Sequence, residues 1–551
     1  MLFTGLLNCK HKSSVFSCSI FSFKLSRIFI RHVWCETSIP YRSQSTWMKF
    51  PIEQLSELRL DEKEQQICEF LVAASAEIDK NDPERSENLV LRLTGGWVRD
   101  KLLGLPSSDL DVAVNRMTGY NFGVALSEFS EHEEKFSNAM QGLHKIAMNP
   151  DSSKHLETTT TMIYGIDVDL VNLRSEEYTE SSRIPIMRFG TPEEDALRRD
   201  ATLNALFYNL QTSQVEDFTG RGLDDLKSGI LRTPLEPFKT FQDDPLRALR
   251  LIRFASRYNF QIEKSAFDSL SLPEIKIALI EKISRERVGT ELYKILTGPD
   301  PVLGLSLIHN SGLEDAIFCL PPQTVVLEAK PEPSRLNTLI YFVDDLLRRK
   351  NVPILSTEIT ADHKEIALIY LFASLSHLAG VTLGSGKPSV ASFRVVRDSI
   401  KLSTSIATAT SDLVTKSPHV LSFVSANEWL RKDAGLLIRS CGERWRQTLF
   451  CALVLDLYEN KASLGEAQII GKYESFIHFI ELNKLENSWN IKPLINGKQI
   501  CSLLKIKPGA WMKSFLETVI EWQLENPEAN AADCEKFVLS CQDLLVKSKF
   551  S

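Results

Sequence analysis

The chain has 551 residues, of which 43% are hydrophobic and 25% are charged, and its formal net charge is −7. This globular composition excludes disorder as the default state, and the length allows several modules that each bury a core. An acidic chain also argues against indiscriminate polyanion binding, so a nucleic acid would have to meet a local basic patch.

The segment 1–48 differs from the rest and predicts a mitochondrial leader. Up to Lys49 the chain carries seven Lys or Arg, many Ser and one acid, Glu36, which is typical of a transit peptide. A disordered tail or a secretory signal is the alternative, but basic residues interrupt the apolar stretches. We therefore expect a mitochondrial location, and a second start at Met48 would give a form for the cytoplasm and nucleus.

Two further classes of protein are disfavoured by the remaining sequence. No apolar run approaches the roughly 18 residues that a membrane span requires, so we expect no membrane contact. The ten cysteines include no C-x-x-C pair, which indicates neither a zinc site nor a disulfide framework.

Strands and helices alternate in the first part of the body. Apolar spacing predicts a helix over 55–78, followed by a strand over 89–94, a helix over 96–103 and a strand over 110–114. Further strands are predicted within HLETTTTMIYG and IDVDLVNLR, where β-branched residues cluster. The pattern predicts a mixed α/β head over 49–210.

Beyond Leu223 the pattern is almost wholly helical, with segments such as DPLRALRLIRFASRY, SRERVGTELYKIL and TLIYFVDDLLRRK. The stretch 234–241 reads as a linker, and the Pro-rich 321–333 and the Gly- and Ser-rich 380–387 read as loops. We therefore expect an all-α neck over 211–300, an all-α body over 301–430 and an all-α tail over 431–551.

The first motif, LTGGWVRDKLLGLPSSDLDVAV, predicts a phosphate and metal site. Gly95 and Gly96 stand between a strand and a helix, where backbone N–H groups can approach a phosphate, and Arg99 follows about one turn later. Asp109 and Asp111 are two apart on a strand, so they share a face and can hold one or two divalent ions such as Mg²⁺. A lone D-x-D more often marks a solvated strand edge, and the upstream GG-x-x-R-D makes the metal site the stronger interpretation.

This first motif resembles the signature of the polymerase-beta-like nucleotidyltransferase superfamily. The resemblance implies a third catalytic carboxylate on a neighbouring strand. Asp169 in IDVDLVNLR is the candidate, and Asp167, two residues away on the same face, is the competing choice.

The second motif, EEDALRRDATLNAL, places two arginines and an acid near the head of a helix, where they could hold phosphate oxygens and a ribose hydroxyl. A solvated helix start explains the letters equally well in isolation. The string resembles the RRD motif of class II CCA-adding tRNA nucleotidyltransferases, with its following T-x-N. The resemblance implies that Asp200 reads the sugar 2′-hydroxyl and that Arg199, joined by Arg198 and Asn204, contacts the nucleotide.

The third motif, FQDDPLRALRLIRFASRYNF, predicts a base reader. Asp244 and Arg247 are three apart within one predicted helix, so an acceptor and a planar set of donors share a face. Arg250 and Arg253 continue the stripe toward a triphosphate. An isolated D-P-L-R is more often a surface salt bridge, but this string resembles the E-D-x-x-R nucleotide-selecting motif of the same family, with Asp243 in place of Glu.

Two other segments resemble family motifs with structural roles. VEDFTGRGLDDL resembles a hinge between head and neck, matched by Asp217, Gly222, Asp225 and Leu226. ISRERVGTEL resembles the last motif of the neck, where charges at these spacings can form intrahelical pairs that keep the neck rigid.

Two regions resemble contact elements of the family. SEEYTESSRIPIMRFGTPEED occupies the place of a mobile loop that helps to switch specificity from C to A, and its polar, Pro-interrupted composition predicts a loop. The tail resembles a tRNA-contacting region in which exposed lysines contact the backbone of the tRNA elbow: Lys492, Lys498, Lys505 and Lys507.

The ordered motifs together imply a template-independent enzyme that adds C, C and A to tRNA 3′ ends from CTP and ATP. By resemblance, Asp109 and Asp111 hold magnesium while the tRNA 3′-hydroxyl attacks the α-phosphate in line and pyrophosphate leaves. The expected partners are tRNA, CTP and ATP, and no obligate protein partner is implied. A member restricted to CC or A, a poly(A) polymerase and an inactive tRNA-binding protein are the alternatives.

Overall fold

The computed structural model describes residues 55, 57–107, 109–146, 158–179, 182–321, 325–328, 333–349, 362–384 and 388–541. These residues belong to one compact unit, Trp47–Ser551. The predicted leader lies outside the described residues.

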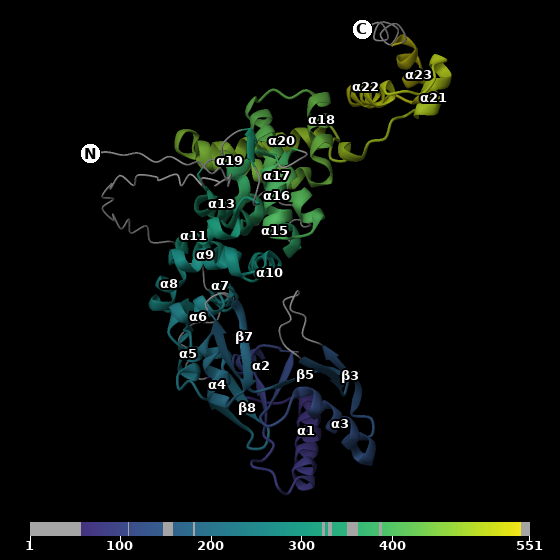
Figure 1. Cartoon of the computed structure of the whole chain (residues 1–551). Coiled ribbons are helices and arrows are strands. Elements are labelled where there is room, and N and C mark those ends of the chain that lie inside the picture. Colours follow the sequence, from purple (N-terminus) through teal and green to yellow (C-terminus); the bar gives the residue numbers. More distant parts are fainter. Residues whose placement is uncertain are drawn as a thin grey trace, which may run out of the picture. The chain divides into compact units, whose positions relative to one another are not determined.

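A seven-stranded mixed sheet forms the centre of the head (Figure 1). Its strand order is β3-β4-β5-β2-β1-β8-β9; β2 and β5 run parallel, and the other neighbours are antiparallel. The strands are β1 (Leu91–Thr94), β2 (Leu110–Val114), β3 (Met140–Ile146), β4 (Thr158–Ile163), β5 (Ile166–Asn172), β8 (Leu206–Asn209) and β9 (Gln214–Asp217). The predicted strand over 110–114 and the mixed α/β class are confirmed.

Helices and one short 3₁₀ turn pack against this sheet. They are α1 (Glu62–Asn81), α2 (Gly96–Leu102), α3 (Gly119–His132), the 3₁₀ turn η1 (Glu134–Phe136) and α4 (Pro192–Leu197). The first helix begins at Glu62 rather than at Leu55, because Asp61 and Glu64 form a capping box that satisfies the free N–H groups of its first turn. Phe70 of α1 packs on Phe136, with ring centroids 5.3 Å apart, so the core continues between these helices.

The predicted mobile loop is instead a β-hairpin of β6 (Arg174–Thr179) and β7 (Ser182–Phe189), apart from residues 180 and 181, which lie outside the described residues. The polar composition misled the prediction, because alternating side chains pair across the two strands. Pro185 is tolerated since it falls where the register of the pair shifts, away from a regular ladder position.

The region after the sheet is mainly helical, as predicted. The 3₁₀ turn η2 (Thr202–Asn204) still precedes β8, and the first elements after β9 are α5 (Gly222–Ser228), β10 (Ile230–Leu231), α6 (Pro237–Asp243), α7 (Leu246–Tyr258), β11 (Gln261–Ile262), α8 (Lys264–Leu270), α9 (Pro273–Lys282) and α10 (Arg285–Leu296). The predicted linker over 234–241 is wrong from Pro237 on, because Glu236 caps α6 through its side chain and proline suits the first helical position.

The following helices continue to the end of the described chain. They are α11 (Pro301–Ser311), α12 (Glu314–Ile317), α13 (Leu336–Arg348), α15 (His363–Leu375), η3 (Ser376–Leu378), α16 (Ala391–Arg394), the π turn η4 (Val395–Ser399), α17 (Thr404–Ser425), α18 (Arg431–Cys441), η5 (Gly442–Arg444), α19 (Trp445–Leu464), α20 (Glu466–Leu482), η6 (Ser488–Asn490), α21 (Gly497–Leu504), α22 (Trp511–Glu525) and α23 (Ala531–Ser540).

A three-stranded sheet interrupts these helices. It consists of β12 (Val325–Glu328), β13 (Thr382–Gly384) and β14 (Ser389–Val390). Two of its strands, β12 and β13, fall where loops were predicted. The pairing joins β12 to a strand more than 50 residues away in sequence, and a local Pro or Gly pattern does not reveal such long-range partners.

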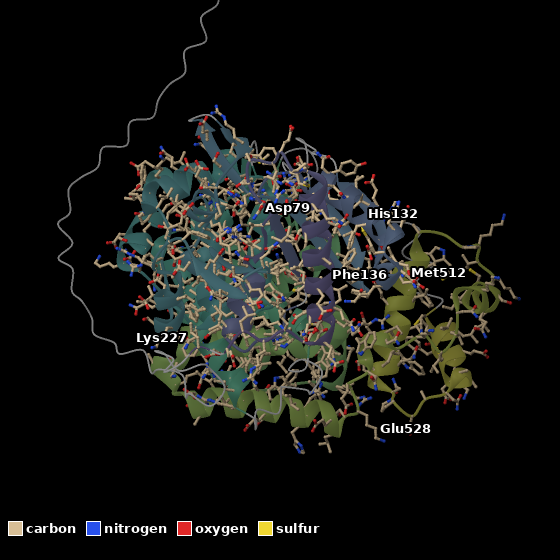
Figure 2. The ribbon with its side chains drawn as sticks, turned by 90° about the horizontal axis from the view of Figure 1, so that it is seen from below. Asp79, His132, Phe136, Lys227, Met512 and Glu528 are labelled. Carbon is tan, nitrogen blue, oxygen red and sulfur yellow. The ribbon has the colours of Figure 1, made fainter. Side chains whose placement is uncertain are left out.

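The tail has a small core of its own. Helices α21, α22 and α23 enclose apolar side chains that include Ile500, Phe515 and Val538, separately from the main core of the chain. Figure 2 shows the side chains of the described residues, with Met512 and Glu528 marking the tail. Among the described helices, none is long and apolar enough to cross a membrane.

Candidate active site

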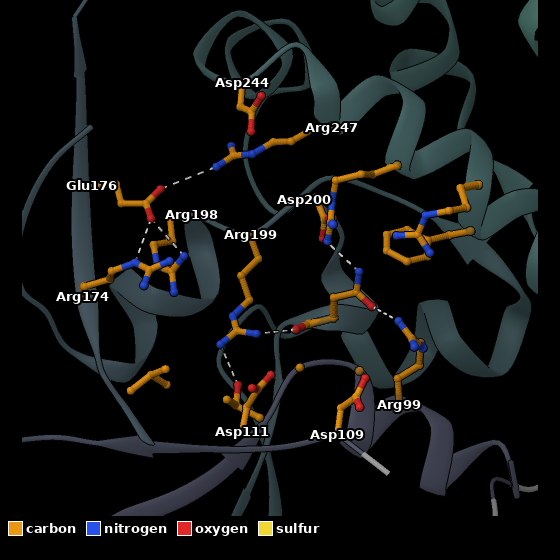
Figure 3. A pocket seen from close by; sticks show the side chains of 18 of the residues that line it. Arg99, Asp109, Asp111, Arg174, Glu176, Arg198, Arg199, Asp200, Asp244 and Arg247 are labelled. Atoms are coloured by element: carbon orange, nitrogen blue, oxygen red, sulfur yellow. Dashed lines mark hydrogen bonds and ion pairs between the residues drawn. The ribbon is translucent and has the colours of Figure 1, made fainter. Parts of the chain in front are cut away.

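One pocket of about 690 Å³ gathers side chains from the sheet, the β6–β7 hairpin and helices α7 and α10 (Figure 3). Of the predicted site residues, the pocket is lined by Gly95, Gly96, Arg99, Asp109, Asp111, Arg199, Asp200, Asn204, Asp244, Arg247, Arg250 and Arg253. Asp169 is not part of this lining, although it lies one strand away.

The strand register places the acidic residues next to one another. Asp111 of β2 is in register with Asp169 of the parallel strand β5, whereas Asp167 is opposite Met162 of β4. Thr160 donates a hydrogen bond of 2.6 Å to Asp169 Oδ1. Of the two competing acids, therefore, it is Asp169 that lies directly beside Asp111.

The electrostatics of Asp111 reflect this crowding. Burial raises the pKa of Asp111 to about 6, with further upward contributions from the charges of Asp169 and Asp109, while Arg199 opposes the change. Carboxylate oxygens that repel one another are donors that suit a hard divalent cation, because such an ion would relieve the repulsion. The described ranges contain no group of three His, Cys, Asp or Glu residues placed to hold a metal ion.

Gly95 allows the turn between β1 and α2. Its φ is +74°, and a Cβ there would lie 3.3 Å from Arg199 Nη1 and 3.6 Å from Asp111 Oδ2. A side chain is therefore disfavoured by both conformation and space. Arg199 is itself held by Thr94 Oγ1 at 2.6 Å and by Asp195 Oδ2 at 2.7 Å, which points it along the floor of the pocket beside Asp111 (Figure 3).

The RRD segment lies at the end of a helix and not at its head. Thr191 and Glu194 form a capping box and Pro192 starts α4, so the helix is complete at Leu197 and Arg198 is its C-cap. Asp200 then precedes the single 3₁₀ turn η2. The prediction was wrong because the start signal seven residues before Arg198 was not used.

Asp200 is almost fully buried, and each of its carboxylate oxygens accepts one hydrogen bond. It accepts from Asn204 Nδ2 at 2.9 Å and from Arg250 Nε at 2.6 Å. Burial alone would raise its pKa, but the charge of Arg250 and these hydrogen bonds hold the pKa of Asp200 well below its ordinary value. The carboxylate stays charged and keeps lone pairs that can accept from a ligand hydroxyl.

Asp244 and Arg247 line the pocket together, but they do not share a helix. Asp244 is extended, with φ −135° and ψ 98°, because the following Pro245 disfavours a helical conformation before it. Its carboxylate accepts from the backbone N–H of Leu246 at 3.1 Å and from Arg287 Nη2 at 3.1 Å. The acid thus lies before the first turn of α7, and Arg247 lies within it.

Sequence analysis did not single out Glu176, an acid of the β6–β7 hairpin that lines this site. Glu176 accepts from Arg174 Nε at 2.9 Å and from Arg198 Nη1 at 3.1 Å, and its other oxygen lies 3.7 Å from Arg247 Nη2 (Figure 3). The only available signal was the alternation R-S-E at a strand start, which puts Arg174 and Glu176 on one face.

The charges of ISRERVGTEL reach outward rather than pairing within their own helix. Arg287 donates to Asp244, and Glu291 accepts from Arg253 of α7. Arg285 donates to three backbone carbonyls, one of them that of Ala316 at 3.0 Å. The intrahelical pairs were a wrong prediction, because the face of α10 that carries Arg287 and Glu291 packs on the site and on α7.

The hinge segment is a local structure. Asp217 accepts from the backbone N–H groups of Thr219 and Leu223, both at 3.1 Å, and Asp225 accepts from Thr202 Oγ1 at 2.7 Å. These bonds fix the turn before α5 and connect it to the RRD region.

Comparison with known proteins decides the family. A model described as "Poly A polymerase head domain" matches residues 91–232, and one described as "Probable RNA and SrmB- binding site of polymerase A" matches residues 259–326. The chain is 40% identical over 499 residues to the protein named "CCA tRNA nucleotidyltransferase, mitochondrial" of Saccharomyces cerevisiae, covering 85% of this chain and 91% of that protein. The chain belongs to the CCA tRNA nucleotidyltransferase family.

Further comparisons support this membership. The protein of the same name from Candida glabrata is 39% identical, with 88% of this chain and 96% of that protein covered. A Thermotoga maritima CCA-adding enzyme solved with tRNA shares the fold, with a TM-score of 0.56 and 20% identity over 89% of this chain and 99% of that chain. The resemblance drawn from the motifs is confirmed, and so is the α/β head followed by mostly helical structure. Nucleotidyltransferases of this family generally use divalent metal ions.

Proposed function

We propose that this chain adds C, C and A to the 3′ ends of tRNA precursors, taking the nucleotides from CTP and ATP without a nucleic-acid template. The observation that carries the proposal is that one pocket is lined both by the acidic pair Asp109 and Asp111 and by the base-reading pair Asp244 and Arg247. A polymerase without a template needs both features within the length of one nucleotide. Neither an inactive tRNA-binding protein nor a structural protein needs them.

Each group has a role that its geometry supports. The carboxylate of Asp244 and the guanidinium of Arg247 offer acceptors and donors to the Watson–Crick edge of a base. Asp200 accepts from the ribose 2′-hydroxyl, while Arg199, Arg250 and Arg253 supply positive charge for the triphosphate. The backbone at Gly95 and Gly96 approaches a phosphate at the start of α2.

The metal of the site is proposed to be Mg²⁺, held by Asp109 and Asp111, with Asp169 as a third catalytic carboxylate. Oxygen donors suit this hard ion, and a cation would relieve the repulsion that Asp169 and Asp109 exert on Asp111. Mg²⁺ held by these two carboxylates would neutralise charge on the triphosphate and would lower the pKa of the attacking 3′-hydroxyl. The protein groups orient the α-phosphate for in-line attack, after which pyrophosphate leaves.

One assay separates this function from the alternatives. The full chain is incubated with tRNA transcripts that lack CCA, that end in one C or that end in CC, each with CTP, ATP or both. We expect extension of all three to a complete CCA end and then arrest. Long A tracts would indicate a poly(A) polymerase, extension of one transcript class only would indicate a partial enzyme, and no extension would refute the proposal.

A matched pair of variants tests the acidic pair. Asp111→Ala should abolish nucleotide incorporation, while tRNA binding measured by gel shift stays within about twofold. Asp224→Ala, an exposed acid on α5, is the control and should keep full activity. Equal activity of Asp111→Ala and the parent chain would show that the metal site is assigned wrongly.

We also propose a division of labour and a location. The head over 49–210 carries the chemistry, the neck over 211–300 carries the base reader, the body over 301–430 joins the neck to the tail, and the tail over 431–551 binds tRNA. The leader directs the chain to mitochondria, and a start at Met48 supplies the cytoplasm and nucleus. Fluorescent fusions in which Met1 or Met48 is replaced should localise to only one set of compartments each.

A further inference from the structure

Asp100 is a buried acid at the site whose carboxylate does not line the pocket. It follows Arg99 in α2 and is 5% exposed. Its Oδ1 accepts from Arg99 Nε at 2.8 Å and from the hydroxyl of Tyr258 at 2.8 Å, and Arg257 Nη2 lies 3.5 Å from Oδ2. Two of these three partners stand at the end of the neck helix α7, so Asp100 joins the head to the neck.

Arg99 is fixed on several sides by this arrangement. With Nε committed to Asp100, its guanidinium lies 4.7 Å from the ring centroid of Tyr258 and 5.5 Å from that of Phe254. Its Nη1 then donates to Asn204 Oδ1. Arg99 therefore directs one specific donor, Nη1, at the side chain of Asn204.

The bond to Asn204 determines which way its side-chain amide faces. Since Arg99 can only donate, it holds the amide oxygen of Asn204, and the Nδ2 group is left to donate to Asp200 Oδ1 at 2.9 Å. Without Arg99 the amide could turn by half a rotation and bring its oxygen against the carboxylate. Arg250 of α7 donates to Asp200 Oδ2 and completes this network of hydrogen bonds.

We propose that Asp100 and Tyr258 are positioning residues for sugar recognition: they hold Arg99, and through Asn204 they fix the orientation of the Asp200 carboxylate. The inference rests on the proposed function, in which Asp200 accepts from the ribose hydroxyl. Burial raises the pKa of Tyr258, so its hydroxyl stays protonated and remains a donor. This network of hydrogen bonds begins at Tyr258 and ends at Arg250, both on α7. Ribose recognition therefore depends on how the neck helix packs against the head.

The test measures discrimination between sugars. Tyr258→Phe keeps the aromatic ring over Arg99 and removes only the hydroxyl that donates to Asp100. For single addition to a tRNA that lacks CCA, we expect KM for CTP to rise about threefold to tenfold, with kcat within about twofold and a fall in the preference for CTP over dCTP, as loss of one hydrogen bond predicts. Tyr208→Phe, in a buried tyrosine that packs near Trp97, is the control and should change nothing.

A second variant tests whether the two residues act together. Asp100→Asn should lower the preference for CTP over dCTP as well. The double variant should lower this preference no further than the more severe single variant does, because both substitutions break the same hydrogen-bond network. Additive effects would overturn the coupling. An unchanged preference in Tyr258→Phe, or an equal loss with both nucleotides together with a lower melting temperature, would reduce the two residues to a structural role.

The result can be separated from the proposed function. If the parent chain extends no tRNA, the proposed function fails, and calorimetric titration of the full chain with CTP and with dCTP still reports sugar discrimination. If the parent chain is active and binds both nucleotides equally, Asp200 does not read the ribose and the inference fails.

Discussion

The carboxyl group of Asp111 makes the folded protein less stable at neutral pH than an uncharged side chain would. Its pKa is raised from 3.8 to about 6 by burial and by neighbouring acids. A carboxyl whose pKa is higher in the folded state favours folding when protonated, so the penalty is absent below about pH 4, grows between 4 and 6, and is complete above 6. We predict that Asp111→Asn stabilises the metal-free protein at pH 7.5 by about 1–3 kcal/mol.

Thermal unfolding in EDTA at pH 4 and at pH 7.5 measures this effect. The gain should appear only at the higher pH, and the same variant should have lost nucleotide incorporation. Glu517→Gln, an exposed acid in the middle of α22, serves as the control and should leave the midpoint unchanged at both values. A gain that is equal at the two pH values would rule out titration as its origin.

A second prediction at this scale concerns Glu176 on the β6–β7 hairpin. This acid holds Arg174 and Arg198 and lies 3.7 Å from Arg247. Glu176→Gln removes the charge and should free the base-reading guanidinium. We expect kcat/KM for CTP to fall about tenfold, as loss of a charge-assisted bond predicts, and misincorporation of UTP to rise.

The neighbouring residue provides the control for Glu176. Glu177 is exposed and lies 3.4 Å from Arg188 on the other strand of the hairpin, so Glu177→Gln changes the same charge without touching the pocket. It should keep the CTP to UTP ratio of the parent chain. If both variants behave alike, the effect belongs to the net charge of the hairpin and not to Arg247.

At the scale of elements, the contact between α10 and the segment after η4 has no room for a side chain. A Cβ on Gly289 would lie 1.8 Å from the carbonyl oxygen of Ile400, and Arg285 of the same helix donates to the carbonyl of Ser399. We predict that Gly289→Ala forces α10 away and destabilises the protein by about 3 kcal/mol. Denaturant unfolding measures the loss.

The control for this contact is another glycine in a helix. Gly471 lies within α20, and a Cβ there would meet nothing within 4 Å. Gly471→Ala should therefore stabilise the protein by about 0.5–1 kcal/mol, through the lower entropy of the unfolded chain. Opposite signs for the two substitutions would trace the first result to the α10 contact, whereas a loss in both would not.

Elements with strong local signals could be predicted from the sequence, and elements that depend on distant partners could not. The strand over 110–114 and the helix over 285–296 follow from β-branched runs and helical periodicity. The β6–β7 hairpin was missed because its polar strands are stabilised by pairing with each other. Asp244 was placed in the wrong element because the effect of Pro245 on the preceding residue was not applied.

The same distinction between local signals and distant partners applies to the residues of the site. Motif residues such as Asp111 and Arg247 were found because the strings that contain them resemble motifs of the family, and the structure brings them to one pocket. Glu176 was not singled out, and Asp100, the acid of GG-x-x-R-D, was given no role. Their contacts with Arg247 and Tyr258 join residues that are far apart in sequence, and a local pattern does not reveal such contacts.

At the scale of the whole molecule, charge limits how tRNA can bind. The chain has a net charge of −7 and a pI near 5.9, so its average field repels a polyanion and attraction must come from local patches. The four tail lysines at 492, 498, 505 and 507 are all exposed, and the ion pairs among the described residues do not involve them. They are thus available to tRNA phosphates.

We predict that replacing these four lysines by glutamine weakens binding of full-length tRNA at least tenfold at 150 mM salt. Each phosphate contact that is lost should also reduce the slope of log K against log salt by about one. The kcat for a short acceptor minihelix should stay unchanged, because the pocket is intact. Filter binding across a salt series measures both quantities.

The matched control replaces four exposed lysines elsewhere in the chain, at positions 63, 80, 227 and 264. It makes the same change in net charge. If the tail contacts the tRNA backbone, only the tail variant changes the salt slope, whereas a general field effect would weaken binding in both variants with similar slopes. Unchanged binding by the tail variant would remove these four lysines from the tRNA interface and leave the acidic chain to bind tRNA through its neck and body.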